Sequence, residues 1–277
     1  MSNDLFKIAR VGLHYFEEPC ISGESGSGTI FFSGCNLRCK FCQNYEISHL
    51  NKGIEVDGKT LKKCMLYLQD QGANNINLVT PALYVVPLKG VLEEVKDQLR
   101  IPVVWNSSGL DGLVPVLALE DVVDIFLPDF KYSDDNVAWE FSGVKDYSER
   151  AFNAIKLMRM RHPKDEFDEN GMMKKGVIVR HLVLPGNIEN SLGVLDKIAE
   201  IDKDMYVSVM SQYFPTKNVK NHPVLGRRVT EREYEKVIDH FFDIGLHNGF
   251  SQEPSSAIED YVPDFDLDAL SELINKL

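Results

Sequence analysis

The chain has 277 residues, of which 44% are hydrophobic and 26% charged, as is typical of a globular protein with one large buried core. Its formal net charge of −12 argues against unassisted binding to nucleic acid, because such binding depends on Lys and Arg side chains. No apolar run approaches the roughly 20 residues of a membrane span. We therefore expect neither a nucleic-acid nor a membrane partner.

Residues 1–28 are predicted to form an N-terminal leader that packs on an edge of the core. The apolar residues that would make this contact are Phe6, Ile8, Val11, Leu13 and Phe16. A Gly/Ser-rich turn follows over residues 23–28. The first residues, Met-Ser-Asn-Asp, lack the basic-then-apolar pattern of a signal peptide, so cysteines further on indicate metal binding rather than disulfides. We expect the protein in the reducing cytoplasm.

From residue 29 onward, strand-like and helix-like patterns alternate. Strands are expected at 29–32, 75–79, 102–105, 122–127, 177–184 and 205–210, and helices at 61–68, 91–99, 114–119, 149–160, 192–201 and 232–242. A last short strand is expected near 248–252, and an exposed insertion at 162–175. Six strand–helix units imply parallel strands with right-handed crossovers. The predicted fold is α/β: a single-domain, partial and open (β/α)6 TIM-like barrel, with its site at the C-terminal ends of the strands.

Three of the five cysteines lie in one short loop after the first of these strands. Cys35, Cys39 and Cys42 have C-x-x-x-C-x-x-C spacing. Three thiolates on one loop can hold three irons of a cubane [4Fe-4S] cluster and leave the fourth iron open to another ligand. The spacing therefore favours an iron–sulfur site.

A structural zinc site is the alternative. Its fourth ligand would be Cys20, Cys64 or His49, and the protein would then be a zinc-stabilised binding protein without catalysis. Zinc sites usually contain a second close cysteine pair, which this sequence lacks. Cys20 and Cys64 are therefore expected to be small buried residues of the core.

The cysteine loop resembles the signature of the radical S-adenosylmethionine (SAM) superfamily. Within it, Cys42-Gln43-Asn44 is similar to the Cys-His-Asn of the pyruvate formate-lyase activating enzymes, and the surrounding residues resemble an uncharacterised activating-enzyme-like branch. The resemblance implies that residues 29–277 form a radical SAM core with a C-terminal extension. It also implies a [4Fe-4S] cluster bound by the three cysteines, SAM on the open iron, and Asn44 as an orienting residue for SAM.

After the second strand, Thr80-Pro81 stands where most relatives carry Gly-Gly-Glu. The resemblance implies that Thr80 contacts SAM through its hydroxyl and backbone. The alternative is an ordinary helix start, with Thr80 as the cap and Pro81 at the first helical position.

The next two strand ends resemble stretches that contact the cofactor in activating enzymes. Asn106-Ser107-Ser108-Gly109 is similar to Asp-Thr-Asn-Gly, and Pro128-Asp129-Phe130-Lys131 to Leu-Asp-Leu-Lys. The resemblance implies cofactor contacts and a monovalent cation, for which the oxygens of Asn106, Ser107 and Asp129 are chemically suited. Asp129 and Lys131 are also predicted to be catalytic; an ordinary ion pair at a strand end is the alternative.

The fifth strand continues into a stretch similar to the Arg-Tyr-Val-Val-Val-Pro-Gly of the same enzymes. Arg180 would reach the carboxylate or ribose of SAM. Because strand neighbours alternate faces, His181 is expected to pack away from the site. Asp124 is expected to be structural. Ser211–Pro215 would contact adenine or substrate or form an apolar rim, and Gln252-Glu253 would close the site or form a turn.

The implied reaction is reductive cleavage of SAM at the cluster to a 5′-deoxyadenosyl radical, followed by hydrogen abstraction. The nearest functional class is a glycyl-radical-enzyme activase, whose partners would be a glycyl-radical enzyme and a reductant such as flavodoxin or ferredoxin. A radical SAM enzyme that acts on a small molecule or another macromolecule is the alternative.

Overall fold

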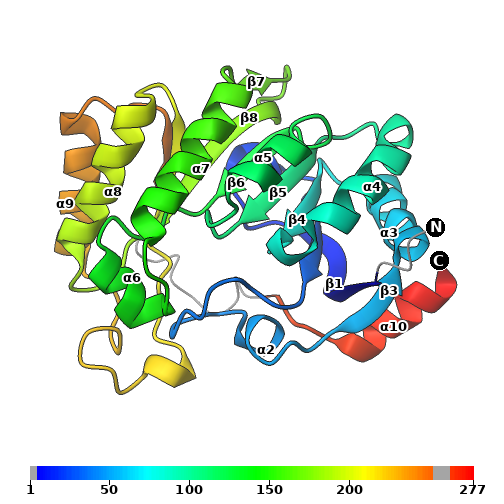
Figure 1. Ribbon diagram of the computed structural model, residues 1–277, viewed down its shortest axis with the longest axis horizontal. Helices are drawn as coiled ribbons and strands as arrows, with labels where there is room; N and C mark the ends of the chain where they lie inside the picture. Colours follow the sequence, from blue (N-terminus) through cyan, green and yellow to red (C-terminus); the bar gives the residue numbers. More distant parts are fainter. Residues whose placement is uncertain (1–4, 252–262) are drawn as a thin grey trace.

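The computed structural model describes residues 5–251 and 263–277, which form one layer of strands surrounded by helices (Figure 1). The strands are β1 Leu5–His14, β2 Ser27–Phe32, β3 Ile54–Asp57, β4 Ile76–Val79, β5 Val103–Ser107, β6 Ile125–Pro128, β7 Glu166–Phe167, β8 Met173–Leu182, β9 Tyr206–Met210 and β10 Gly249–Ser251. The α-helices are α1 Pro19–Ser22, α2 Tyr45–Ser48, α3 Gly58–Asp70, α4 Val85–Val95, α5 Leu113–Leu119, α6 Asp135–Ser142, α7 Tyr147–Arg161, α8 Ile188–Ile201, α9 Glu231–Asp243 and α10 Leu267–Lys276. Three 3₁₀ helices are η1 Ala82–Tyr84, η2 Lys96–Gln98 and η3 Lys217–Val219.

The sheet has the strand order β10-β9-β8-β6-β5-β4-β2-β1-β3, and β7 pairs with β8 outside this path. Its centre is the predicted run of six parallel strands, β2, β4, β5, β6, β8 and β9, which are neighbours in chain order. Helices α3, α4, α5, α7 and α8 cover their outer face (Figure 1). The path ends at β3 and β10, so the barrel is open. The predicted partial (β/α)6 barrel is confirmed.

Burial explains the composition of the central strands. Every residue of β4, β5 and β6 is buried, because helices cover one face and the interior of the barrel lies on the other. The helices begin at polar caps that the sequence supplies. Asp57 accepts from Thr60 N at the start of α3, and Thr230 and Glu233 form a reciprocal capping box at the start of α9.

The predicted leader covers an edge of the core, but it does so as a strand of the same sheet. Strand β1 pairs antiparallel with both β2 and β3. Its residues Phe6 and Ile8 are fully buried, so the spaced apolar residues of this segment reflect a strand. Helix α10 packs against β1. The chain beyond β1 then turns at residues 15–18 toward the C-terminal ends of the parallel strands.

Several elements differ from the sequence-based expectation. The predicted insertion at 162–175 contains the short strand β7, whose antiparallel pairing with β8 makes β8 begin at Met173. Helix α6 was not predicted; Asp134 caps its start and Gly143, in the left-handed conformation, ends it.

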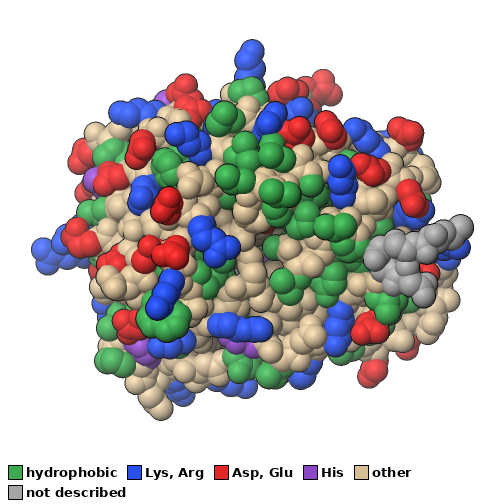
Figure 2. Space-filling view, in the orientation of Figure 1, with side chains coloured by type: hydrophobic (Ala, Val, Ile, Leu, Met, Phe, Trp, Pro, Cys, Tyr) green, Lys and Arg blue, Asp and Glu red, His purple; other side chains and the backbone are tan. Residues whose placement is uncertain are grey.

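Apolar side chains gather on the surface over α5 and the nearby part of α4 (Figure 2), where Val86 and Val114 are strongly exposed. Within the described residues, no helix combines the length and apolarity needed to cross a bilayer.

Candidate active site

An open cavity of about 230 Å³ lies at the C-terminal ends of the parallel strands. The residues predicted to form the site all line it: Cys35, Cys39, Cys42, Asn44, Thr80, Asn106, Ser107, Asp129, Lys131 and Arg180. They come from the loop after β2 and from the ends of β4, β5, β6 and β8. The structure therefore brings the predicted residues together at one cavity, while their roles stay predictions.

The cysteine loop connects β2 to α2 and is fastened to the end of α6. Arg38 N donates to Ser142 O and Lys40 N to Phe141 O. The Ser142 hydroxyl donates to Cys39 Sγ at 2.9 Å, and Leu37 N donates to Cys35 Sγ at 3.4 Å. These contacts fix the direction of the thiols from outside the cavity.

None of the three cysteines forms a disulfide. Burial raises the pKa of each thiol, that of Cys42 to about 12. They would therefore be neutral without a cationic partner, and a metal centre would deprotonate them. Three thiols on one cavity wall suit a cubane cluster with an open iron. No three His, Cys, Asp or Glu side chains in residues 5–251 and 263–277 converge on a position for a single ion.

None of the residues considered as a fourth zinc ligand lines the cavity, although His49 interacts with the Cys39 backbone. Cys20 packs with Ile125 and Ile178, and Cys64 is fully buried on α3, as expected for small core residues. His49 stacks on Tyr45 at 4.5 Å between ring centroids.

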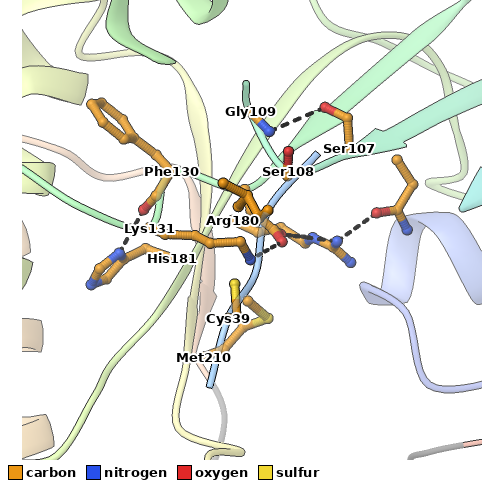
Figure 3. A network of polar contacts seen from close by, with 12 residues as sticks. Cys39, Ser107, Ser108, Gly109, Phe130, Lys131, Arg180, His181 and Met210 are labelled. Carbon is orange, nitrogen blue, oxygen red and sulfur yellow. Dashed lines mark hydrogen bonds and ion pairs between the residues drawn. The ribbon is translucent and has the colours of Figure 1, made fainter. Parts of the chain in front are cut away.

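The floor of the cavity is a network of ion pairs centred on Arg180. Its Nε donates to Asp129 Oδ1 at 3.0 Å, its NH1 to Glu17 Oε2 at 3.0 Å and its NH2 to Asn106 Oδ1 at 2.6 Å. Lys131 Nζ donates to the other carboxylate oxygen of Asp129 at 2.5 Å. Figure 3 shows the Lys131 and Arg180 side chains close together above Cys39, and dashed lines join both to the same carboxylate.

The charges of this network support one another. The neighbouring cations Arg180 and Lys131 outweigh the effect of burial and hold the pKa of Asp129 below its usual value. Asp129 and Glu17 raise the pKa of Arg180. Asp129 and Lys131 thus form an ion pair, and Arg180 extends that pair to the N-terminal segment.

His181 points away from the cavity, as the alternation of strand faces predicted (Figure 3). Its ring nitrogens lie 2.8 Å from Phe130 O and 2.9 Å from the Ser191 hydroxyl, and the side chain is fully buried. Burial lowers the pKa of His181 to about 4, so the ring is neutral at pH 7. Asp124 is also structural, since it accepts from Val103 N at 2.8 Å.

The loop after β5 links the cysteine loop to the barrel. Ser108 donates to Asn36 Oδ1 at 2.8 Å, and Asn36 donates to Leu110 O at 2.9 Å. A side chain at Gly109 would collide with Asp129 O, which the Cβ would meet at 2.1 Å. Ser107 turns its hydroxyl toward the Asp111 carboxylate.

Thr80 has the left-handed φ of 59°, which is rare for a β-branched residue. Its N–H donates to Asn106 O at 2.9 Å. The alternative of a Thr cap followed by Pro at the first helical position is wrong: Pro81 itself is the N-cap of η1, and no side chain caps that turn. Asn44 occupies the N-cap position of α2 without a side-chain capping bond, and it lines the cavity.

The 211–215 stretch divides between cavity and core. Gln212 lines the cavity, whereas Tyr213 is buried, donates to Leu225 O and meets the Phe41 ring edge-on at 5.8 Å between centroids. Gln252 and Glu253 lie outside the described residues.

The contributors to the site that were not predicted include His14, Glu17, Ser48 and Ser142. Glu17 follows the segment expected to be only a leader, and it accepts from Asn77 and Asn106 as well as from Arg180. An acidic pair directly after a strand, Glu17-Glu18, was the one signal available. Burial and the nearby arginines lower the pKa of His14 to about 4.

Comparison with known families decides the classification. The sequence profile of the radical SAM superfamily matches residues 29–187, which is more than half of the chain.

The chain belongs to the radical SAM superfamily.

A curated relative, an uncharacterised protein from Methanocaldococcus jannaschii, is 32% identical over 223 residues, which cover 77% of this chain and 61% of that protein. The chain thus spans about three fifths of the length of this relative. This radical SAM chain also resembles several solved structures at low sequence identity. Streptococcus suis SuiB bound to S-adenosylmethionine is 14% identical with a TM-score of 0.56, over 79% of this chain and 48% of that one. The hydrogenase maturase HydG from Carboxydothermus hydrogenoformans is 13% identical with a TM-score of 0.58, over 90% and 65%. These likenesses establish the fold.

Proposed function

We propose that this chain is a radical SAM enzyme in which Cys35, Cys39 and Cys42 bind a [4Fe-4S] cluster and the cavity beside them binds SAM. The observation that carries the proposal is that the three thiols and the polar ring of strand ends open onto the same cavity. When bound, the reduced cluster supplies the electron that cleaves SAM to methionine and a 5′-deoxyadenosyl radical, which abstracts hydrogen from a substrate.

The chain itself contributes position and charge. Lys131 and Arg180 present positive charge to the cavity beside Cys39, which suits the carboxylate of the methionyl group of SAM. Asp129 keeps both cations in place, and Asn44, Thr80, Asn106 and Ser107 line the same space with neutral polar groups.

The finer proposal is a glycyl-radical-enzyme activase that receives electrons from a flavodoxin or ferredoxin. It is supported by the similarity of the strand ends at 106–109, 128–131 and 180–186 to the activating enzymes. Action on a small molecule is the competing proposal, and the absence of Gly-Gly-Glu at Thr80-Pro81 favours it.

The central test is anaerobic reconstitution with iron and sulfide, followed by dithionite and SAM. We expect about four irons per chain and formation of 5′-deoxyadenosine. Cys39→Ala should abolish the product and lower the iron content, while Cys64→Ala, at a buried cysteine away from the cavity, should preserve both. Zinc in place of iron and sulfide, or equal product from Cys39→Ala, would overturn the proposal.

The activase proposal needs a separate test. The reduced protein and SAM are incubated with a candidate glycyl-radical enzyme, and the partner is examined by electron paramagnetic resonance. An organic radical signal with backbone cleavage of the partner in air supports activation. SAM cleavage that a small molecule accelerates, with no radical on any protein partner, favours the competing proposal.

A further inference from the structure

The oxygens expected to hold a monovalent cation are already engaged within the chain. Asn106 Oδ1 accepts from Arg180 NH2 at 2.6 Å, and Asp129 accepts from both Arg180 and Lys131. The Ser107 hydroxyl is turned away toward Asp111. The three predicted ligands therefore do not fit a cation in addition to the side chains that now contact them.

The Arg180 guanidinium has the surroundings that a bound cation would have. It lies among oxygens from three separate segments: Glu17 after β1, Asn106 in β5 and Asp129 after β6. Its side chain is only 14% exposed, and those of Glu17 and Asp129 are 8% and 18% exposed. A guanidinium is permanently charged and presents several donors in a fixed plane.

The charge balance of the network leaves little attraction for another ion. The carboxylate of Asp129 contacts both Arg180 and Lys131, and that of Glu17 contacts Arg180. Glu18 also interacts electrostatically with Arg180, and burial raises the pKa of both Glu17 and Glu18, which weakens their attraction for an added ion. A further cation at this depth would be repelled by Arg180 and Lys131 and would lose its hydration shell.

We propose that Arg180, held by Glu17, takes the place of the monovalent cation, so that this chain binds SAM without such an ion. Glu17 is a positioning residue in this arrangement: it binds one arm of the guanidinium and is itself held by Asn77 at 3.1 Å. The inference about SAM rests on the proposed function, whereas the inference about the ion site concerns the protein alone.

The ion site is tested on the apoprotein by thermal unfolding at equal ionic strength in sodium, potassium and tetramethylammonium chloride. We expect the melting temperature of the wild type to be the same in all three salts. Arg180→Ala leaves the oxygens of Asp129, Glu17 and Asn106 without a cation, so sodium or potassium should raise its melting temperature by about 2–4 °C over tetramethylammonium.

Arg227→Ala is the matched control, because Arg227 is paired with the Glu233 carboxylate outside the cavity. It should show no preference among the salts. If Arg180→Ala does not fold, Arg180→Gln keeps much of the side-chain volume and serves in its place. Stabilisation of the wild type by sodium or potassium, or no ion preference in a folded Arg180 variant, overturns the proposal.

The second arm measures SAM cleavage by the reconstituted wild type in the same three salts. Equal 5′-deoxyadenosine yields, within about twofold, support the inference, and a requirement for sodium or potassium contradicts it. A loaded protein that makes no product in any salt counts against the proposed function, while the melting temperatures of the apoprotein still decide the ion site. The two failures are therefore distinguishable.

Discussion

The cavity has two different walls, the cysteine loop and the Arg180 network, which differ in whether their ionisable groups already have partners. The cysteine loop brings three neutral thiols together within one short stretch, and burial opposes their ionisation. The Arg180 network brings together charges from three separate segments, and each charge already has a partner. The thiols of the loop lack a cationic partner that would ionise them, while the charged groups of the network are already paired with one another. Stability of the apoprotein should therefore depend on the network, and cofactor content on the loop.

Breaking the network should have the largest effect on the apoprotein. Asp129→Asn leaves Arg180 and Lys131 close together without the carboxylate that both contact. We expect the free energy of unfolding to fall by about 3 kcal/mol, because removing the carboxylate leaves buried positive charge without its partner. Urea unfolding of the apoprotein measures this change.

Cys35→Ala is the matched variant on the other wall. Its thiol accepts one long backbone hydrogen bond, so we expect a loss of less than about 1 kcal/mol. Equal losses from Asp129→Asn and Cys35→Ala would contradict the contrast between the two walls.

The stability contributions of His181, which packs behind the cavity, and of Asp129 should be lost in different pH ranges. The folded-state pKa of His181 is about 4 against an ordinary 6.5, so the unfolded chain binds a proton first as the pH falls. Stability is therefore lost between pH 6.5 and 4, by roughly 3 kcal/mol for this residue. Asp129, with its lowered pKa, contributes stability that is lost only below its ordinary value of 3.8.

The measurement is the free energy of unfolding from pH 7 to pH 4. His181→Gln should have a shallower slope than the wild type, and the remaining slope includes His14, whose pKa is also about 4. His247→Gln, at an exposed position, is the control. An unchanged slope in His181→Gln would mean that the folded protein and the unfolded chain bind a proton at this ring equally well.

The same contrast explains what the sequence could predict. The cysteine loop is local, so spacing alone indicated its chemistry, and alternating strands and helices placed the other site residues at the strand ends. The contact of Glu17 with Arg180 joins residues 163 positions apart. The spacing of apolar residues in a sequence cannot predict a contact between residues so far apart. In addition, strand β1, which positions Glu17, was expected to be a leader. Helix α6, which supplies Ser142 to the loop, is only eight residues long and lacked a clear apolar pattern.

The hydrogen bond between Ser142 and Cys39 connects the loop to the barrel, and its loss should shift the properties of the cluster. Ser142 is fully buried and also pairs with the Tyr132 hydroxyl at 2.6 Å. Hydrogen bonds to cluster sulfurs favour the reduced, more negative state. Ser142→Ala should therefore lower the midpoint potential by about 30 mV, equivalent to roughly 0.7 kcal/mol for one electron.

A potentiometric titration followed by electron paramagnetic resonance measures this shift. Tyr132→Phe should shift the potential less, because its hydroxyl contacts Ser142 rather than the sulfur. A higher potential in Ser142→Ala would show that the hydroxyl does not donate to Cys39 in the loaded protein.

A further small effect is expected at Thr80, which lines the same cavity. Its φ of 59° places a β-branched side chain in the left-handed region, at a cost of roughly 1–2 kcal/mol. Thr80→Gly removes that cost but adds freedom to the unfolded chain, worth about 0.5–1 kcal/mol. The variant should therefore be more stable by up to about 1.5 kcal/mol.

Binding of SAM should change in the opposite direction if the Thr80 hydroxyl contacts the cofactor. Thr80→Gly would then bind SAM more weakly, while Thr80→Ser, which keeps the hydroxyl, would bind it as the wild type does. Urea midpoints and SAM dissociation constants measured on the same three proteins separate the two effects. A Thr80→Gly variant that is more stable and binds SAM unchanged would show that the strain at Thr80 serves only the backbone bond to Asn106, which either residue can make.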